Sequence, residues 1–319
     1  MFAVYAARID KDEPLKGLES GERPEPVAPE GWAVVRLRAA ALNHHDLWSL
    51  RGVGLPEERL PMILGCDGAG VDEDGNEVVV HAVVGESGRG VKDGERPSIL
   101  TERYQGTFAE RVVVPRWNLL PKPAALSFEQ AACLPTAWLT AYRMLFTRSG
   151  TRPGDTILVQ GAGGGVASAL IVLGRAAGYR IWVTSRSEEK RARALELGAH
   201  AAFESNGRLP ERVDAVMETV GAATWAHSVA SVREEGTIVI SGATSGPNPP
   251  AALTRVFFHQ LRVVGSTMGS REELGALLRF CEVTGVRPVI DSVRPLAEAA
   301  DGFAAMAAGE LVGKVVFAV

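Results

Sequence analysis

The first third of the chain alternates between apolar and polar positions over short stretches, a pattern typical of half-buried β-strands. From Trp32 to Ala39, Val35 and Leu37 fall on one side of an extended chain, and Arg36 and Arg38 fall on the other. Two further apolar runs follow at 76–84 and 106–114. We therefore expect this part to consist mainly of β-strands, with no helix of any length.

The period of the pattern changes after about residue 124. Residues 128–146 have a helical pattern, and short apolar runs then alternate with helical stretches. The predicted strands are Thr156–Gln160, Arg180–Thr184, Val213–Met217 and Thr237–Ser241. Strands that alternate with helices indicate a parallel sheet. The Pro-punctuated segment 119–127 lies between the two patterns and marks a domain junction.

The C-terminal tail continues the mixed pattern. A predicted strand at 262–267 is followed by helices near 271–283 and 296–308 and by a last strand at 314–319. The pattern alone does not say which domain this tail joins.

A glycine-rich turn carries the strongest chemical signal. The strand Thr156–Gln160 runs into Gly161-Ala-Gly-Gly-Gly-Val-Ala167, and an apolar helix pattern follows. In such a turn, main-chain N–H groups and the helix N-terminus bind a pyrophosphate. Close approach would fall to Gly163, Gly164 and Gly165, while Val166 replaces the last glycine of a strict G-x-G-x-x-G. The alternative is a glycine-rich turn with no ligand, but the strand and helix around it favour a dinucleotide site.

The end of the next strand indicates which dinucleotide binds. An NAD site usually has an acidic residue there, but this strand runs into Ser185-Arg186-Ser187. Ser185, Arg186 and Lys190 could surround a 2′-phosphate, so we predict NADP(H). The alternative is that Ser187 only caps the next helix and Arg186 is solvated. The two interpretations are compatible.

Charge and cysteine content exclude several classes of function. The 319 residues include 34 Lys and Arg against 38 Asp and Glu, with a net charge of −4 and no basic run, so we expect no nucleic-acid partner. Three widely separated cysteines argue against a disulfide framework. Arg8 and Asp10 interrupt any signal-peptide core, so we expect a cytoplasmic protein that does not bind membranes.

Taken together, these segments resemble the medium-chain dehydrogenase/reductase superfamily, in particular its zinc-free alcohol dehydrogenase-like and quinone oxidoreductase-like members. The resemblance is carried by AALNHHDLW (40–48), LGCDGAG (64–70), GTFAERVVVP (106–115), the run 118–145, RPGDTILVQGAGGGVA (152–167), VDAVMETVG (213–221), VVGSTMG (263–269) and VGKVVF (312–317). It implies a GroES-like β-barrel catalytic domain formed by 1–122 and 268–319. Residues 123–267 would form a doubly wound, Rossmann cofactor domain.

The sequence departs from the zinc-dependent members of this superfamily at each catalytic ligand. Asn43 and Thr136 stand where cysteines would be, and Cys66 stands where a histidine would be. Because a catalytic zinc takes three protein ligands, a lone Cys66 predicts no metal. The stretch 81–105 also lacks the cysteines of the family's second zinc lobe, so we expect a bare loop there. An unorthodox metal site made by His44, His45, Cys66 and Asp67 remains an alternative.

Loss of zinc changes the chemistry that is expected. Without a Lewis acid to stabilise an alkoxide, a conjugated enone or quinone is the better hydride acceptor, because the enolate formed is less basic. We therefore predict an NADP(H)-dependent oxidoreductase acting on an enone, quinone or related carbonyl. One alternative is an alcohol or aldehyde dehydrogenase that is either zinc-free or assisted by a metal at Cys66, His44 and His45. Another is a sensor or structural protein that binds NADPH without turnover.

The resemblance also suggests roles for individual residues. Asn43 would orient substrate and nicotinamide, and His45 would be the general acid. Asp46 would orient His45 or tie its loop to the barrel. Thr136 and Thr140 would face the nicotinamide.

A second group of residues lies at predicted strand ends. Gly242, Ala243 and Ser266 would border the nicotinamide, because an α/β sheet binds ligands at the carboxyl ends of its strands. The strand 262–267 resembles the edge through which family members pair, so we predict a homodimer.

Overall fold

The computed structural model describes residues 1–85 and 97–319, and the chain divides into two compact units. One unit combines residues 1–137 with 270–319, and the other comprises residues 138–269. The Pro-punctuated segment 119–127 lies inside the first unit, and the chain leaves that unit only after Ala137, within a continuous helical stretch.

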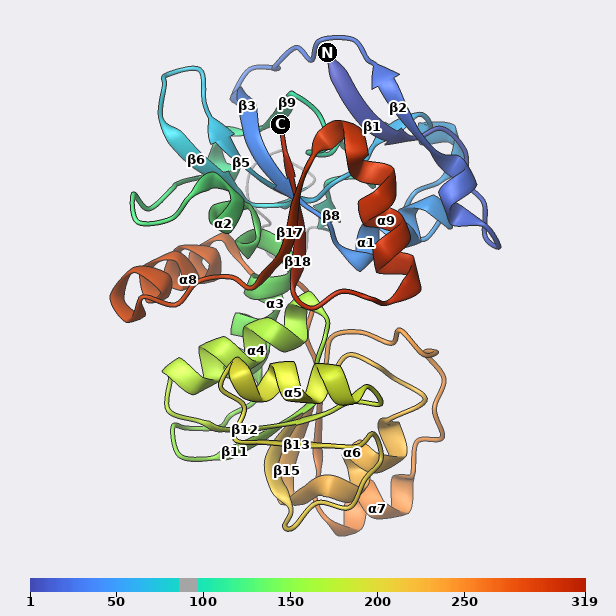
Figure 1. Cartoon of the computed structure of the whole chain (residues 1–319), viewed down its shortest axis with the longest axis vertical. Helices are drawn as coiled ribbons and strands as arrows, with labels where there is room; N and C mark the ends of the chain where they lie inside the picture. The colour runs from blue at the N-terminus through green and yellow to red at the C-terminus, as the bar shows by residue number, and fades with distance from the viewer. Residues whose placement is uncertain (86–96) are drawn as a thin grey trace. The chain divides into compact units, whose positions relative to one another are not determined.

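The unit 138–269 is built on a six-stranded sheet in which every neighbouring pair is parallel. The strand order is β13-β12-β11-β14-β15-β16, and Figure 1 labels β11, β12, β13 and β15 of this sheet. The strands are β11 (Thr156–Gln160), β12 (Arg180–Thr184), β13 (Ala201–Phe203), β14 (Val213–Glu218), β15 (Val232–Ile240) and β16 (Arg262–Gly265). The predicted parallel sheet is confirmed, and β11 and β12 have the predicted ends.

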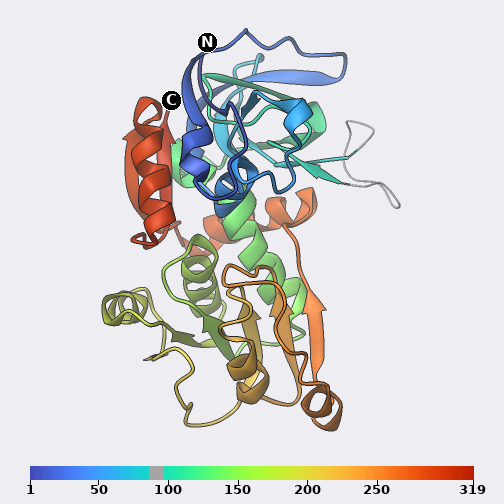
Figure 2. The same ribbon diagram turned by 90° about the vertical axis from the view of Figure 1, so that its right-hand side faces the viewer.

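Helices cover both faces of this sheet (Figure 2). They are α3 (Leu139–Tyr142), α4 (Gly165–Ala176), α5 (Glu188–Glu196), α6 (Trp225–Ser231) and α7 (Leu253–Phe258). Gly174 of α4 lies against Ile181, whereas Trp225 and Val229 of α6 pack with Trp182. Because Ile181 and Trp182 are neighbours in a strand, α4 and α6 lie on opposite faces.

The predicted helical run at 128–146 is present, but it is not a regular α-helix. It consists of α2 (Phe128–Ala132), the π-helical η4 (Leu134–Trp138), α3 and the π-helical η5 (Arg143–Arg148). Such π-turns within a helix often occur at functional sites. Thr136 lies in η4.

The other unit is a β-structure formed by a seven-stranded and a three-stranded sheet, with a two-stranded ladder beside them. The larger sheet has the order β10-β6-β5-β3-β18-β17, and β9 also pairs with β3. Its strands are β3 (Trp32–Ala41), β5 (Asp67–Val71), β6 (Glu77–Val80), β9 (Arg111–Pro115), β10 (Leu119–Pro121), β17 (Ile290–Pro295) and β18 (Lys314–Ala318). The smaller sheet joins β1 (Phe2–Ala6), β2 (Leu18–Glu22) and β4 (Met62–Ile63), and the ladder joins β7 (Val83–Val84) to β8 (Ser98–Ile99).

The C-terminal tail belongs to this unit, because β18 pairs with β3 and β17 pairs with β18. The helices α8 (Arg271–Thr284) and α9 (Ala299–Ala308) accompany these strands. Phe108, Phe303 and Phe317 meet edge to face in the core, with ring centroids 6.0 and 5.1 Å apart. The tail thus supplies strands and core side chains that the first third of the chain lacks.

One prediction for this unit was wrong. The first third contains a helix, α1 (His44–Leu50), where we expected none. Asn43 precedes it, and the backbone N–H of Asn43 donates to Asp46 Oδ2 at 2.9 Å. This N-terminal cap stabilises a helix too short to show its own apolar period.

Two further predictions concern the loop at 81–105 and the relation of the chain to membranes. Residues 86–96 of the predicted bare loop at 81–105 lie outside the described residues. Among the helices that the structure does describe, none is both long and apolar enough to cross a membrane.

Candidate active and cofactor sites

A buried ion pair lies at the centre of the barrel unit. Lys314 of β18 and Asp67 of β5 are 2% and 0% exposed, and Lys314 Nζ lies 3.0 Å from Asp67 Oδ2. The ammonium also donates to Asn43 Oδ1 at 2.6 Å and to the carbonyl of Leu42 at 2.7 Å. Hydrogen bonds to the remaining ammonium protons offset part of the cost of removing this pair from water.

Asn43 is held by this ion pair. Its Nδ2 donates to Asp67 Oδ2 at 2.9 Å and to the carbonyl of Ala41 at 3.2 Å. Both amide hydrogens and the amide oxygen are therefore engaged within the protein. In this arrangement Asn43 has no spare donor for a substrate oxyanion, and the geometry favours a positioning role.

Asp46 acts on the backbone. Its carboxylate accepts the N–H of Asn43 at 2.9 Å and the N–H of Gly65 at 3.0 Å. Burial raises the pKa of Asp46 to about 7, against the opposing effect of these two donors. The contacts match the predicted alternative in which Asp46 ties its loop to the barrel.

His45 lies in a small polar cluster. Its Nε2 is 2.9 Å from Thr101 Oγ1 and 3.5 Å from Ser49 Oγ. Burial lowers the pKa of His45 to about 4. An imidazole with this pKa is neutral at pH 7, which disfavours His45 as a charged general acid. Its catalytic role stays a prediction.

The alternative metal site does not fit the donors present. Cys66 is fully buried, and its Sγ donates to the carbonyl of Leu100 at 3.4 Å. Burial raises the pKa of this thiol, so the thiolate that zinc requires is disfavoured. Asp67 is already paired with Lys314, and His44 is exposed. In the described parts of the chain, no group of three or more His, Cys, Asp or Glu side chains could hold a metal ion.

Thr136 has an unsatisfied hydroxyl. Its Oγ1 is buried and makes no hydrogen bond, although the residue lies in the π-helical segment η4. A buried hydroxyl without a partner costs free energy unless a ligand or water satisfies it. This observation is consistent with the predicted role of Thr136 at the reaction site. Thr140, one turn later, is also buried.

The glycine turn after β11 has the form that a pyrophosphate requires. Gly161 has a φ of +86°, which favours glycine, and Gly164 is the N-cap of α4 with an ordinary φ of −72°. A Cβ at Gly164 would meet no heavy atom within 4 Å. Neither backbone strain nor packing within the protein explains this glycine, whereas the approach of a ligand would. Gly163, Gly165 and Val166 continue the turn into α4.

The turn after β12 contains no carboxylate. Ser185 is buried and its Oγ accepts the N–H of Ser187, while Arg186 is exposed. Ser187 caps α5 by accepting the N–H of Lys190 at 3.2 Å. Arg191, which was not predicted from the sequence, also contacts this turn. Its Nη1 donates to the carbonyls of Ser185 and Arg186 at 2.7 and 3.3 Å. This guanidinium fixes the turn, and the N-cap at Ser187 leaves the Arg186 side chain exposed.

A cavity of about 240 Å³ is lined by residues that follow the strands β14 and β15. Gly242 and Ala243, which follow β15, belong to its wall together with Gly221 and Trp225. Ser266 follows β16, and its buried Oγ has no hydrogen-bond partner. These residues lie at the carboxyl edge of the sheet, where ligands of such folds bind.

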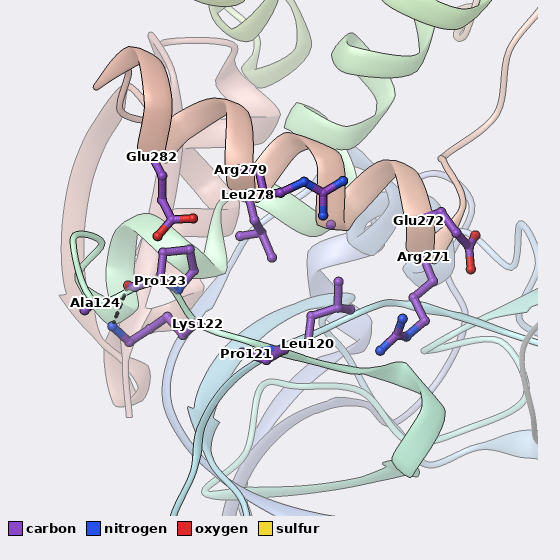
Figure 3. Close-up of a pocket in the computed structure, with 11 residues that line it drawn as sticks. Leu120, Pro121, Lys122, Pro123, Ala124, Arg271, Glu272, Leu278, Arg279 and Glu282 are labelled. Atoms are coloured by element: carbon purple, nitrogen blue, oxygen red, sulfur yellow. Dashed lines mark hydrogen bonds between the residues drawn. The ribbon is translucent and has the colours of Figure 1, made fainter.

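A larger groove of about 640 Å³ lies in the barrel unit, between the segment after β10 and α8 (Figure 3). Lys122, Arg271 and Arg279 line it together with Glu272 and Glu282. The residues of the buried ion pair are not among those that line the groove. Its charges are of both signs, and it contains no predicted site residue.

Several buried polar residues of the structure were not predicted from the sequence. Lys314, Gln160 and Glu218 each adjoin a run of three buried apolar residues in a strand. A polar residue directly beside such a run is the signal that could have identified them. No comparable signal marks Thr101, which has a φ of +79°.

A GroES-like barrel unit and a Rossmann unit with an open glycine turn define a pyridine-nucleotide oxidoreductase. Residues 29–124 match the model for the alcohol dehydrogenase GroES-like domain, and residues 165–283 match the model for zinc-binding dehydrogenases. The chain belongs to the medium-chain dehydrogenase/reductase superfamily. This confirms the predicted family and fold.

Relatives and solved structures agree over nearly the whole chain. A quinone oxidoreductase of Lama guanicoe is 27% identical over 94% of this chain and 92% of its own length. The structure of an NAD-dependent alcohol dehydrogenase is 35% identical, covers both chains completely and has a TM-score of 0.90. A 2-octenoyl-CoA carboxylase reductase in complex with NADP and 2-octenoyl-CoA has a TM-score of 0.88 at 26% identity, and covers 99% of this chain and 87% of its own.

Proposed function

We propose that this oxidoreductase transfers a hydride from NADPH to an enone, a quinone or a related conjugated carbonyl, without a catalytic zinc. The observation that carries the proposal is the barrel site, where the Lys314–Asp67 ion pair and the Asn43 side chain are hydrogen-bonded to one another. Three soft or imidazole ligands would be needed for zinc, and Cys66 is the one residue of that kind at the expected positions. A substrate whose product is a weakly basic enolate needs no Lewis acid.

The proposed reaction has separate roles for the glycine turn, Thr136 and the proton donor. The glycine turn and the N-terminus of α4 would bind the pyrophosphate of the dinucleotide, which would supply the hydride. Thr136 Oγ1 offers an unused hydrogen bond to the substrate or nicotinamide. Burial lowers the pKa of His45 to about 4, so its ring carries no extra proton at pH 7. The proton that completes the reduction therefore comes from solvent or from another side chain.

The cofactor preference rests on Ser185 and Arg186. Neither residue repels a 2′-phosphate, and the exposed Arg186 guanidinium can pair with one. The relatives support both cofactors, since one solved structure is named for NAD and another contains NADP.

The first prediction tests this preference. Arg186→Ala should weaken NADPH binding by about 10- to 100-fold, the value of one charge-assisted contact, and leave NADH binding unchanged. Titration calorimetry with both dinucleotides measures the effect. Arg193→Ala is the matched control, because Arg193 lies on α5, the helix that follows the turn with Arg186, and pairs with Glu196. A wild-type protein that prefers NADH, or equal loss for both dinucleotides, would overturn the cofactor assignment.

Turnover and metal content test the rest. The wild-type protein should oxidise NADPH with a panel of enones and quinones after chelation and without stoichiometric zinc. Zinc bound one to one and lost together with activity would favour an alcohol or aldehyde dehydrogenase. Tight NADPH binding without turnover on the whole panel would favour a sensor.

The proposal extends to a homodimer of this chain. The strand β16 lies at the edge of the six-stranded sheet, with Val263 44% exposed. Phe257 and Phe258 of the adjacent α7 are 61% and 68% exposed. An open edge with apolar side chains beside it favours pairing with a second copy.

A further inference from the structure

Three neighbouring strands end in buried polar residues on one face of the six-stranded sheet. Gln160 ends β11, Thr184 ends β12 and Glu218 ends β14. Gln160 is in register with Thr184, and the residue before Gln160 is in register with the residue before Glu218. All three are 0% exposed.

The same face of the sheet is apolar two residues earlier in each strand. Leu158, Trp182 and Val216 pack there against Trp225 and Val229 of α6. A row of polar side chains at the end of such a face costs free energy unless every member is hydrogen-bonded. The polar residues are therefore not explained by packing alone.

Ser228 of α6 joins the three strand ends into one chain of hydrogen bonds. Thr184 Oγ1 donates to Gln160 Oε1 at 2.6 Å, and Gln160 Nε2 donates to Ser228 Oγ at 2.9 Å. Ser228 Oγ then donates to Glu218 Oε2 at 2.6 Å. We call Thr184, Gln160, Ser228 and Glu218 the strand-end network.

The network has a direction, because each donor points toward Glu218. Glu218 Oε1 accepts the backbone N–H groups of Val220 at 2.8 Å and Gly221 at 3.0 Å, and Thr224 Oγ1 adds a further donor. Gln160 uses its second amide hydrogen on His227 Nδ1 at 2.9 Å. The carboxylate thus ends the chain and holds the turn that follows β14.

Each strand end leads directly into a turn at the cofactor edge of the sheet. Gln160 precedes the glycine turn, Thr184 precedes Ser185 and Arg186, and Glu218 precedes the turn with Gly221 at a φ of +91°. A dinucleotide lies across these turns, with the adenosine ribose at the second strand and the pyrophosphate at the first. A shift of one turn relative to another would therefore misalign the ligand.

We propose that the strand-end network sets the spacing of the three turns and that its members are positioning residues for the dinucleotide. They act through the backbone that follows them. The inference needs a pyridine dinucleotide but depends on the proposed function no further than that.

The test separates the two halves of the network. Ser228→Ala cuts the link between β11 and β14 and leaves the Thr184–Gln160 link in place. It should weaken NADPH binding about tenfold and leave adenosine 2′,5′-bisphosphate binding unchanged, because in folds of this kind that fragment is expected at the turns after β11 and β12 and not at the turn after β14. Thr184→Val has nearly the same shape and cuts the other link. It should weaken the binding of both ligands.

Calorimetric affinities are compared with the free energy of unfolding of each variant. Ser231→Ala is the matched control, since Ser231 lies on the same helix and its hydroxyl contacts His227 Nε2, on the opposite side of the ring from the nitrogen that accepts from Gln160. A variant with a lower free energy of unfolding but unchanged affinity for both ligands would overturn the inference. So would an equal loss of affinity for both ligands in Ser228→Ala. If the wild-type protein binds NADH in preference, the proposed cofactor is wrong, and the same comparison is made with NADH and ADP.

Discussion

At the scale of single residues, burial decides protonation in the barrel unit. The pKa of His45 falls to about 4 and that of Asp46 rises to about 7, in each case mainly because burial disfavours the charged form. Both residues lie in α1, so burial of this one short helix shifts both pKa values. Neither state follows from the sequence, because reference pKa values predict charged Asp46 and partly charged His45.

His45 should make the protein less stable in acid. Its folded-state pKa is below the unfolded value of 6.5, so the unfolded chain binds the extra proton as the pH falls from 6.5 to 4. Relative to His45→Gln, the wild-type free energy of unfolding should drop on the order of 3 kcal/mol across this window. Urea unfolding of both proteins between pH 4 and pH 7.5 measures the difference.

Asp46 is kept in both proteins, because its effect on the free energy of unfolding changes with pH in the opposite direction to that of His45. Its raised pKa means that stability is lost as the pH rises from 3.8 to about 7. Parallel pH profiles for the wild-type protein and His45→Gln would contradict the prediction.

At the scale of elements, a single ion pair joins segments from both ends of the chain. Lys314 is on β18, Asp67 is on β5, and the Asn43 that they hold begins α1. Strands and helix are thereby fixed to one another at the barrel site.

Breaking this pair should be costly. Lys314→Met leaves Asp67 buried without its counter-ion and should lower the free energy of unfolding by about 3–5 kcal/mol. The double variant Lys314→Met with Asp67→Leu removes both charges and should recover most of that loss. Denaturant unfolding measures both, and a single variant within about 1 kcal/mol of wild type would contradict the prediction.

Elements with a strong local pattern were predicted correctly. The apolar runs at Thr156–Gln160 and Arg180–Thr184 form strands with those ends, because buried parallel strands have continuous apolar sequences. The helix α1 was missed because its formation depends on Asp46 and on packing rather than on apolar period. The strand β17 was missed as well, since its apolar residues Ile290 and Val293 are three positions apart and do not show the period of two that indicates a strand.

At the scale of the whole molecule, the sheet edge and the exposed phenylalanines lead to an oligomerisation prediction. Val263→Lys places a charge on the open edge strand β16, which should shift a dimer to monomer at micromolar concentration. Sedimentation velocity measures the change. Val293→Lys is the matched control, because Val293 is 52% exposed on β17, an edge strand of the other unit. A wild-type monomer at the same concentration would contradict the proposal.

The sequence by itself determined the alternation of strands and helices in the parallel-sheet unit, the glycine turn and the superfamily, because these depend on local periodicity and on motifs of adjacent residues. Only the tertiary structure decided that Lys314 lies against Asp67 and Asn43, and that Thr184, Gln160 and Glu218 share one chain of hydrogen bonds. Such partners lie far apart along the chain, and strand order and register bring them together. Burial, which sets the protonation of His45 and Asp46, arises in the same way.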